Sequence, residues 1–233
     1  MIRRISDQLT LVGTAHILPK SVGEVKEIIQ REKPEVVGVE LDQTRYIALT
    51  TRKEAREPSA GRTRANEFSK ILQFIQDRFA RKTGSPAGEE MLTAVESSRE
   101  IGARVELIDR DIRITLQRFM NRLGFWGKLK LAFEALFSLL PFGKKINLEN
   151  ITEEEVVEKL ITELKDFSEP AYEVLIQERN QYMAEKIVKL MKSSSGKVIC
   201  VIGAGHVPGL QKELELKAER GEFEPWESFE LKT

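Results

Sequence analysis

Four short apolar segments, separated by long amphipathic stretches, constrain the fold of this chain more than any other feature. They are rich in valine and isoleucine and are bounded by glycine, proline or charged residues: QLTLVG (8–13), EVVGVEL (35–41), RVELID (104–109) and KVICVIG (197–203). Strands that alternate with helical patterns are typical of βα units around a parallel sheet. The sequence therefore predicts an α/β fold with a mainly parallel central sheet flanked by helices.

Two segments interrupt this alternation of strands and helices. Residues 52–66 are polar and basic and contain a proline and a glycine, so we expect a mobile loop there. Residues 115–168 are predicted to form an inserted helical region, in which apolar side chains recur at helical spacing over 119–142. We interpret this apolar face as packing against the core or as a homodimer contact, and an interfacial membrane helix is the alternative. The whole chain, 1–233, is predicted to form a single domain.

The charge balance and the cysteine content restrict the partners and the compartment. The chain has 37 basic and 37 acidic residues, so no net field favours nucleic acid, and no nucleic-acid partner is expected. Cys200 is the single cysteine, which excludes an internal disulfide, and it is interpreted as a buried strand residue. The sequence has no signal-peptide pattern and no apolar stretch long enough to span a bilayer. A cytoplasmic location is therefore expected.

The chain contains only two histidines, and both lie in the same local pattern. His16 and His206 each end a Gly-x-x-His sequence that follows a predicted strand directly. Because the carboxyl ends of parallel strands meet at one edge of a sheet, both imidazoles should reach that edge. A lone histidine is more often a hydrogen-bonded structural residue, but two imidazoles held together are half of a metal site. Their shared context favours metal binding.

Acidic residues follow the second predicted strand. Glu40 lies near its end, where an ionised carboxylate is costly unless it is paired or ligates a metal. An ion pair with Arg45 is the alternative to a metal-ligating role for Glu40. Asp42, two residues further on, is interpreted as a turn residue or a helix cap.

Charged residues also follow the third predicted strand and occur on two predicted helices. Asp109, Arg110 and Asp111 cluster at the same edge of the sheet, and at least one of them is expected in a salt-bridge network. Arg179 lies on an otherwise apolar helical stripe, so it requires an acidic partner or an anionic ligand. Glu90 lies in the first turn of a helix, where a carboxylate often serves only to complement the helix dipole.

Five segments resemble the TraB family of pheromone-shutdown or PrgY-like proteins: GTAHILPKSVGEV, VVGVELDQTR, GEEMLTAVESSREIGARVELIDRDIRITLQR, QERNQYMAEKI and VIGAGHVPGL. This family is similar to the wider Tiki-like superfamily, which includes metal-dependent proteases, erythromycin esterases and haem-binding ChaN-like proteins. The resemblance implies a Tiki or erythromycin-esterase-like α/β core in which both histidine loops face one cleft. Many proteins of this family continue into a membrane-spanning C-terminal region, so the resemblance implies either the soluble part of a longer, membrane-anchored protein or a family member that lacks the anchor.

The resemblance and the residue pattern together lead to the hypothesis of a metal-dependent, peptidase-like hydrolase. His16, His206 and Glu40 are the predicted ligands of a divalent zinc, manganese or cobalt ion, and the substrate is a peptide or a small signal molecule. The residues expected to move protons, stabilise the oxyanion or hold the substrate are Glu90, Arg45, Asp109, Arg110 and Arg179. Two non-catalytic alternatives are a peptide-binding or pheromone-binding module and a haem-binding module.

Overall fold

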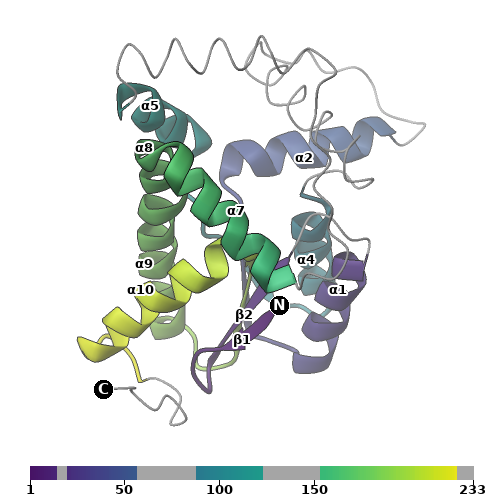
Figure 1. Ribbon diagram of the computed structural model, residues 1–233. Coiled ribbons are helices and arrows are strands. Elements are labelled where there is room, and N and C mark those ends of the chain that lie inside the picture. The colour runs from purple at the N-terminus through teal and green to yellow at the C-terminus, as the bar shows by residue number, and fades with distance from the viewer. Residues whose placement is uncertain (15–19, 57–87, 123–152, 225–233) are drawn as a thin grey trace.

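The computed structural model describes residues 1–14, 20–56, 88–122 and 153–224, and it contains a five-stranded sheet (Figure 1). The strands are β1 (Ile2–Arg4), β2 (Leu9–Thr14), β3 (Val36–Val39), β4 (Arg104–Leu107) and β5 (Val198–Gly203). Their order in the sheet is β1-β2-β5-β3-β4. The four strands from β2 to β4 in this order are mutually parallel, and β1 is an antiparallel edge strand.

Helices cover both faces of the sheet. The helical elements are α1 (Lys20–Glu32), α2 (Gln43–Arg56), α4 (Glu89–Glu100), α5 (Ile112–Arg122), α7 (Glu153–Phe167), α8 (Glu169–Tyr172), the π-helical segment η1 (Glu173–Gln177), α9 (Glu178–Lys192), the 3-10 turn η2 (Ala204–His206) and α10 (Val207–Glu219). Helices α9 and α10 pack on one face, and α1 and α4 pack on the other. The predicted α/β fold with a mainly parallel sheet is therefore confirmed.

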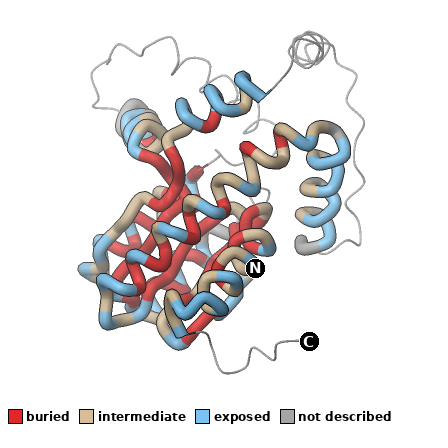
Figure 2. The backbone as a smooth tube through the Cα atoms, turned by 90° about the vertical axis from the view of Figure 1, so that its left-hand side faces the viewer, coloured by how far each residue is buried: buried red, intermediate tan, exposed pale blue. Residues whose placement is uncertain are grey.

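The alternation of side chains along the strands divides the core into two parts. In β5, Cys200 and Ile202 face the α9–α10 side, whereas Ile199 and Val201 face the α1–α4 side. Buried residues accordingly follow the strands and the sides of the helices that face them (Figure 2). Because β5 is buried on both faces, its sequence is a continuous apolar run, as is usual in a parallel sheet.

Helix α8, the segment η1 and helix α9 form one continuous helix, whose hydrogen-bonding pattern changes midway. Ser168 caps α8 by accepting a hydrogen bond from the Ala171 nitrogen, and Pro170 occupies the first turn. The chain then passes through η1, where the Glu178 N–H donates to the Glu173 carbonyl five residues earlier, and continues as α9. Such π-helical turns occur frequently at functional sites. This one ends two residues before Arg179.

The structure corrects two expectations and leaves another outside its described part. Residues 52–56 belong to α2 and not to the expected loop, and β1 was not predicted. Within 115–168, α5 and α7 confirm helical structure at the two ends, whereas most of the apolar face at 119–142 lies outside the described residues.

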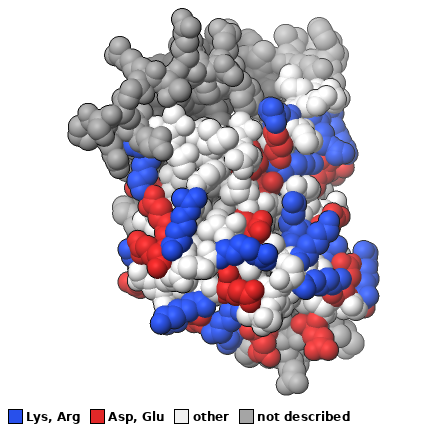
Figure 3. Space-filling model, turned by 180° about the vertical axis from the view of Figure 1, so that it is seen from behind, with Lys and Arg blue, Asp and Glu red and all other residues white. Residues whose placement is uncertain are grey.

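Two features of the described part concern contact with nucleic acid and passage through a membrane: the distribution of surface charge and the length of the helices. On the face seen in Figure 3, basic and acidic side chains are interspersed, without a region of one sign. None of the helices in the described ranges combines the length and apolar character needed to cross a bilayer.

Candidate functional site

The carboxyl ends of β3, β4 and β5 bring three predicted site residues together. Glu40 directly follows β3, Asp109 lies two residues after β4, and His206 ends the η2 turn that follows β5. Arg179, from the first turn of α9, reaches all three of these side chains. The cluster thus lies where parallel α/β sheets usually place their sites.

Arg179 is the centre of this cluster. Its Nε and Nη2 donate to Asp109 Oδ1 and Oδ2 at 3.0 and 2.6 Å, and Nη2 also donates to Glu40 Oε1. Its Nη1 lies 2.8 Å from His206 Nε2 and 3.1 Å from the Leu175 carbonyl oxygen, to which it donates. A guanidinium group has five N–H donors, and these five contacts give each of them an acceptor within the protein. Arg179 in this arrangement has no donor left for a substrate.

Glu40 is held in the ionised form although it is buried. Oε2 accepts a hydrogen bond from the Gly203 backbone nitrogen at 2.6 Å, and Oε1 lies 3.4 Å from His206 Nε2. Burial alone would raise the pKa of Glu40, but the His206 imidazole in its protonated form, the Arg179 and Arg45 guanidinium groups and the Gly203 N–H lower it to about 2. The sequence suggested Arg45 as its ion-pair partner; the ion pair is instead with Arg179.

His206 contacts a residue on each side of its ring. Nδ1 lies 2.7 Å from Asn180 Oδ1, and Nε2 faces Arg179 and Glu40. The side chain is 6% exposed, and this burial, with the Arg179 charge, lowers the pKa of His206 although Glu40 acts in the opposite direction. The imidazole is therefore neutral near pH 7 and can accept a hydrogen bond.

Asn180 was not among the residues predicted from the sequence. It is 3% exposed and lies next to Arg179 in α9. Asparagine is a poor residue for a helix interior, because its side chain competes for backbone hydrogen bonds. An asparagine beside a buried arginine, in an otherwise strong helical sequence, was the signal that could have identified it.

Arg45 completes the cluster from the first turn of α2. Its Nη1 donates to Asp109 Oδ2 at 3.0 Å, and its side chain is 24% exposed, more than that of Arg179 at 14%. Asp42 begins this helix, because its Oδ1 accepts from the Thr44 and Arg45 nitrogens at 2.8 and 3.1 Å. The interpretation of Asp42 as a helix cap is thus confirmed. Among the described residues, Arg45 is the cluster cation with donors to spare.

Arg110 points away from the cluster. Its Nε donates to Thr115 Oγ1, its Nη1 to Glu178 Oε2, and its Nη2 to the Val174 carbonyl, at 3.1, 2.7 and 3.1 Å. These bonds connect the end of β4 to α5, to η1 and to the start of α9. The predicted catalytic role of Arg110 has no geometric support, and its contacts instead fix the helix that carries Arg179.

The remaining predicted residues are placed as follows. Glu90 is buried in the first turn of α4, which packs against α1 and β3. Asp111 forms a separate, exposed ion pair with Arg113, whereas Asp109 and Arg110 belong to the expected salt bridges after β4. His16 lies outside the described residues. The structure therefore brings together five of the eight predicted site positions: Glu40, Arg45, Asp109, Arg179 and His206.

The described donors fit a divalent ion only in part. Within the described ranges, no three His, Cys, Asp or Glu side chains are grouped as metal ligands. His206 Nε2 and Glu40 Oε1 lie 3.4 Å apart, but both face the Arg179 guanidinium, which already provides a positive charge there. A metal ion at this pair would require Arg179 to withdraw and a further ligand to join.

Two glycines of the GAGHVPG sequence are required by close approach. A Cβ on Gly209 would lie 2.1 Å from Asn180 Nδ2, and a Cβ on Gly203 would lie 3.3 Å from Glu40 Oε2. The first distance is far below van der Waals contact, so a side chain at 209 would displace the Asn180 amide. The glycines therefore let the strand exit and the helix start pack directly on the cluster.

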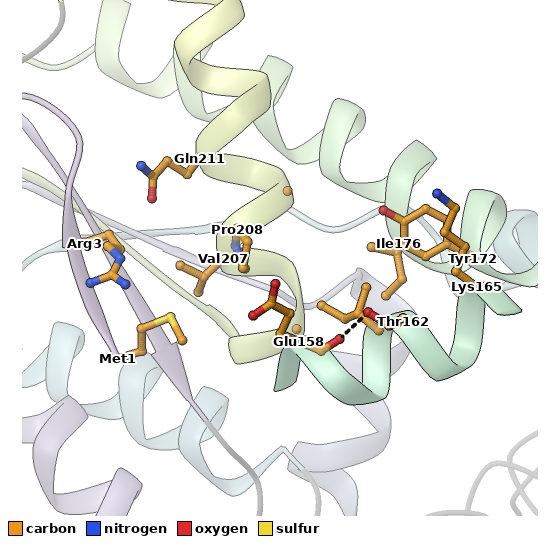
Figure 4. A pocket seen from close by; sticks show the side chains of 13 residues that line it. Met1, Arg3, Glu158, Thr162, Lys165, Tyr172, Ile176, Val207, Pro208 and Gln211 are labelled. Atoms are coloured by element: carbon orange, nitrogen blue, oxygen red, sulfur yellow. Dashed lines mark hydrogen bonds between the residues drawn. The ribbon is translucent and has the colours of Figure 1, made fainter. Parts of the chain in front are cut away.

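A cavity of about 420 Å³ lies between β1, α7 and the start of α10, and the residues that line it do not include those of the cluster (Figure 4). Gly205 and Val207, the neighbours of His206 in the sequence, both line it. Side chains of mixed character surround it, including Ile161, Tyr172 and Ile176. Its volume is within the range of small-molecule sites.

The fold and the cluster define the chain as an α/β protein with a buried histidine, arginine and carboxylate site at the carboxyl edge of a parallel sheet. The sequence profile of the TraB/PrgY/gumN family matches residues 2–222, and the chain belongs to this family.

Among known proteins, the chain is 35% identical to the uncharacterized protein MJ1365 of Methanocaldococcus jannaschii, over 91% of this chain and 54% of that protein. It is 26% identical to the TraB domain-containing proteins of Mus musculus and Homo sapiens, over 91% of this chain and 64% of theirs. The chain thus spans between about half and two thirds of the length of these relatives.

One solved structure also aligns with the chain. It is described as cofacial heme binding to ChaN of Campylobacter jejuni, with 11% identity and a TM-score of 0.38 over 90% of this chain and 77% of that one. A similarity of this extent supports no inference about ligands.

Proposed function

We propose that the chain is a hydrolytic domain that acts on an amide or ester bond in a peptide or a small signal molecule. The observation that supports this proposal most is the buried, neutral imidazole of His206, whose Nε2 faces the Glu40 carboxylate and the Arg179 guanidinium group. Ionisable groups with strongly perturbed pKa values in one cluster are typical of catalytic sites.

His206 and Glu40 would hold a divalent zinc, manganese or cobalt ion once Arg179 withdraws from between them, with His16 as the third ligand predicted from the sequence. When bound, such an ion supplies a water molecule whose pKa is near neutral. The protein's own part is to keep Nε2 unprotonated and Glu40 ionised. Burial keeps the His206 ring unprotonated, and the neighbouring positive charges keep Glu40 ionised.

Arg45 is the residue that would bind the substrate. Arg179 uses all its donors inside the cluster, whereas Arg45 uses Nη1 on Asp109 and keeps the rest of its guanidinium group for an incoming oxygen. Its partial exposure places it at the surface side of the cluster. A substrate carboxylate or a developing oxyanion is the group that suits a guanidinium.

The experiment combines elemental analysis with digestion of a peptide library. Protein purified without added metal is analysed for zinc, manganese and cobalt, and the peptides are examined by mass spectrometry after incubation. His206→Ala should lose both the bound ion and the cleavage products, whereas Glu100→Gln, an exposed substitution, should keep both. Cleavage that persists in His206→Ala would refute the proposal.

A non-catalytic binding module is the second candidate. The observation that favours it is the saturation of Arg179, because a cluster whose charges are neutralised internally can be purely structural. It predicts that peptides bind without any cleavage product. Binding of haem is tested separately, by a Soret band that appears on titration and is lost in His206→Ala.

A further inference from the structure

Both ring nitrogens of His206 are in contact with adjacent residues of α9. Arg179 Nη1 carries only protons, so the nitrogen 2.8 Å from it, His206 Nε2, must provide a lone pair. In a neutral imidazole the single proton is then on Nδ1. Asn180 Oδ1 lies 2.7 Å from Nδ1 and accepts that proton's hydrogen bond.

We infer that Asn180 is a positioning residue, which holds His206 in the Nδ1–H tautomer so that the Nε2 lone pair points into the cluster. This inference deepens the proposed function and rests on the role given there to His206. The Nδ1–H tautomer is the one in which Nε2 carries a lone pair, which accepts from Arg179 here and could ligate an ion or take a proton once Arg179 withdraws.

The surroundings leave Asn180 little freedom. Its side chain is buried, and the absence of a side chain at Gly209 provides the space for its amide. Arg179 and Asn180 lie two and three residues after the end of η1, and η1 is itself connected to the end of β4 by the Val174–Arg110 hydrogen bond. The Asn180 amide is therefore held between α10, at Gly209, and its own helix α9. Its oxygen gives the imidazole an acceptor at a fixed position.

The ¹⁵N shifts of the imidazole ring test this inference, because the two tautomers give different signals at the two nitrogens. The chain has only two histidines, so a His16→Ala background leaves the signals of His206 alone. In that background we expect a pyrrole-type signal at Nδ1 and either a pyridine-type or an ion-bound signal at Nε2. Nε2–H as the main form would overturn the inference.

Three substitutions isolate the contribution of Asn180. Asn180→Leu removes the acceptor and should shift both ring nitrogens to the intermediate values of a mixed tautomer population. Asn180→Asp keeps an oxygen at that place and should restore the original pattern. Gln181→Leu, at the exposed next position, is the matched control and should leave the ring signals unchanged.

Gly209→Ala provides a second route that leaves every hydrogen-bonding side chain in place. The added Cβ would displace the Asn180 amide and should produce the same intermediate shifts. If this variant and Asn180→Leu both fold, as judged by their amide spectra, and both retain the wild-type ring signals, the inference is wrong. A fixed tautomer in a protein that cleaves no peptide would refute the proposed function and leave this inference intact.

Discussion

Glu40 Oε2 lies 2.6 Å from the backbone nitrogen of Gly203, so the side chain that follows β3 is hydrogen-bonded to the residue that ends β5. The other oxygen of Glu40 accepts from Arg179, on a helix far along the sequence. One carboxylate therefore joins two strands and a helix. Its charge should contribute to stability as well as to the site.

Glu40→Gln should destabilise the protein by about 3 kcal/mol, because it removes one partner of a buried ion pair while Arg179 stays buried. The measurement is urea unfolding at pH 7. Glu100→Gln removes an exposed carboxylate whose ion pair is with Lys26, and it should change the free energy of unfolding by no more than about 0.5 kcal/mol. Equal effects of the two substitutions would contradict a structural role for the Glu40 charge.

The stability of the wild-type protein should fall in acid through Glu40. Its folded-state pKa is about 2 and its ordinary value is 4.5, so its stabilising contribution is complete above pH 4.5 and is lost as the pH falls toward 2. The shift corresponds to about 3 kcal/mol. The free energy of unfolding, measured from about pH 5 to about pH 2, should depend less steeply on pH for Glu40→Gln than for the wild type.

His206 contributes to the pH dependence in a separate and higher window. Burial lowers its pKa below 6.5, so the unfolded chain binds a proton there more readily than the folded protein does. Stability should therefore decline as the pH falls below 6.5, and His206→Asn should remove this part of the slope. If the free energy of unfolding of His206→Asn declines below pH 6.5 as steeply as that of the wild type, His206 is not the group responsible.

Two glycine substitutions should act in opposite directions. A Cβ on Gly13 would lie 2.5 Å from Val207 Cγ2 at the buried end of β2, so Gly13→Ala should cost about 1–3 kcal/mol. Gly23 is exposed within α1 and has nothing within 4 Å of an added Cβ. Gly23→Ala should stabilise the protein by about 0.5–1 kcal/mol through helix propensity alone, as measured by thermal unfolding.

Arg45→Lys should weaken substrate binding without a comparable loss of stability. A lysine keeps the charge but loses the paired donors, so we expect KM to rise about tenfold to a hundredfold, as for loss of a hydrogen bond to a charged group. Arg99→Lys, another arginine substitution at an exposed position on α4, is the control and should leave KM unchanged. An unchanged KM in Arg45→Lys would exclude Arg45 as the substrate-binding group.

The sequence predicted the sheet well because its inner strands are marked by composition. Valine-rich runs such as VICVIG have few alternatives to a buried parallel strand. β1 carried no such signal, because it is three residues long, contains two arginines and is exposed. Residues 52–56 are polar, which predicted a loop, yet they continue α2 to its end at Arg56.

The candidate site was predicted as a set of residues but not as a set of contacts. Strand ends and the Gly-x-x-His pattern placed Glu40, Asp109 and His206 at one edge, as the structure has them. The pairing of Glu40 with Arg179 depends on how α9 lies across the sheet, which local sequence does not specify. Asn180 was missed although an asparagine inside a strong helical sequence was a local signal; its contact with His206 depends on the same position of α9.

The π-helical segment η1 makes the position of Arg179 and Asn180 depend on the number of residues that precede them. A hydrogen bond that spans five residues instead of four accommodates one residue more than a regular turn. Deleting a single residue from this segment would allow an unbroken α-helix and would rotate all that follows by about 100°. Chain length at this point, independent of which side chains are present, therefore determines whether the guanidinium and amide groups face the imidazole.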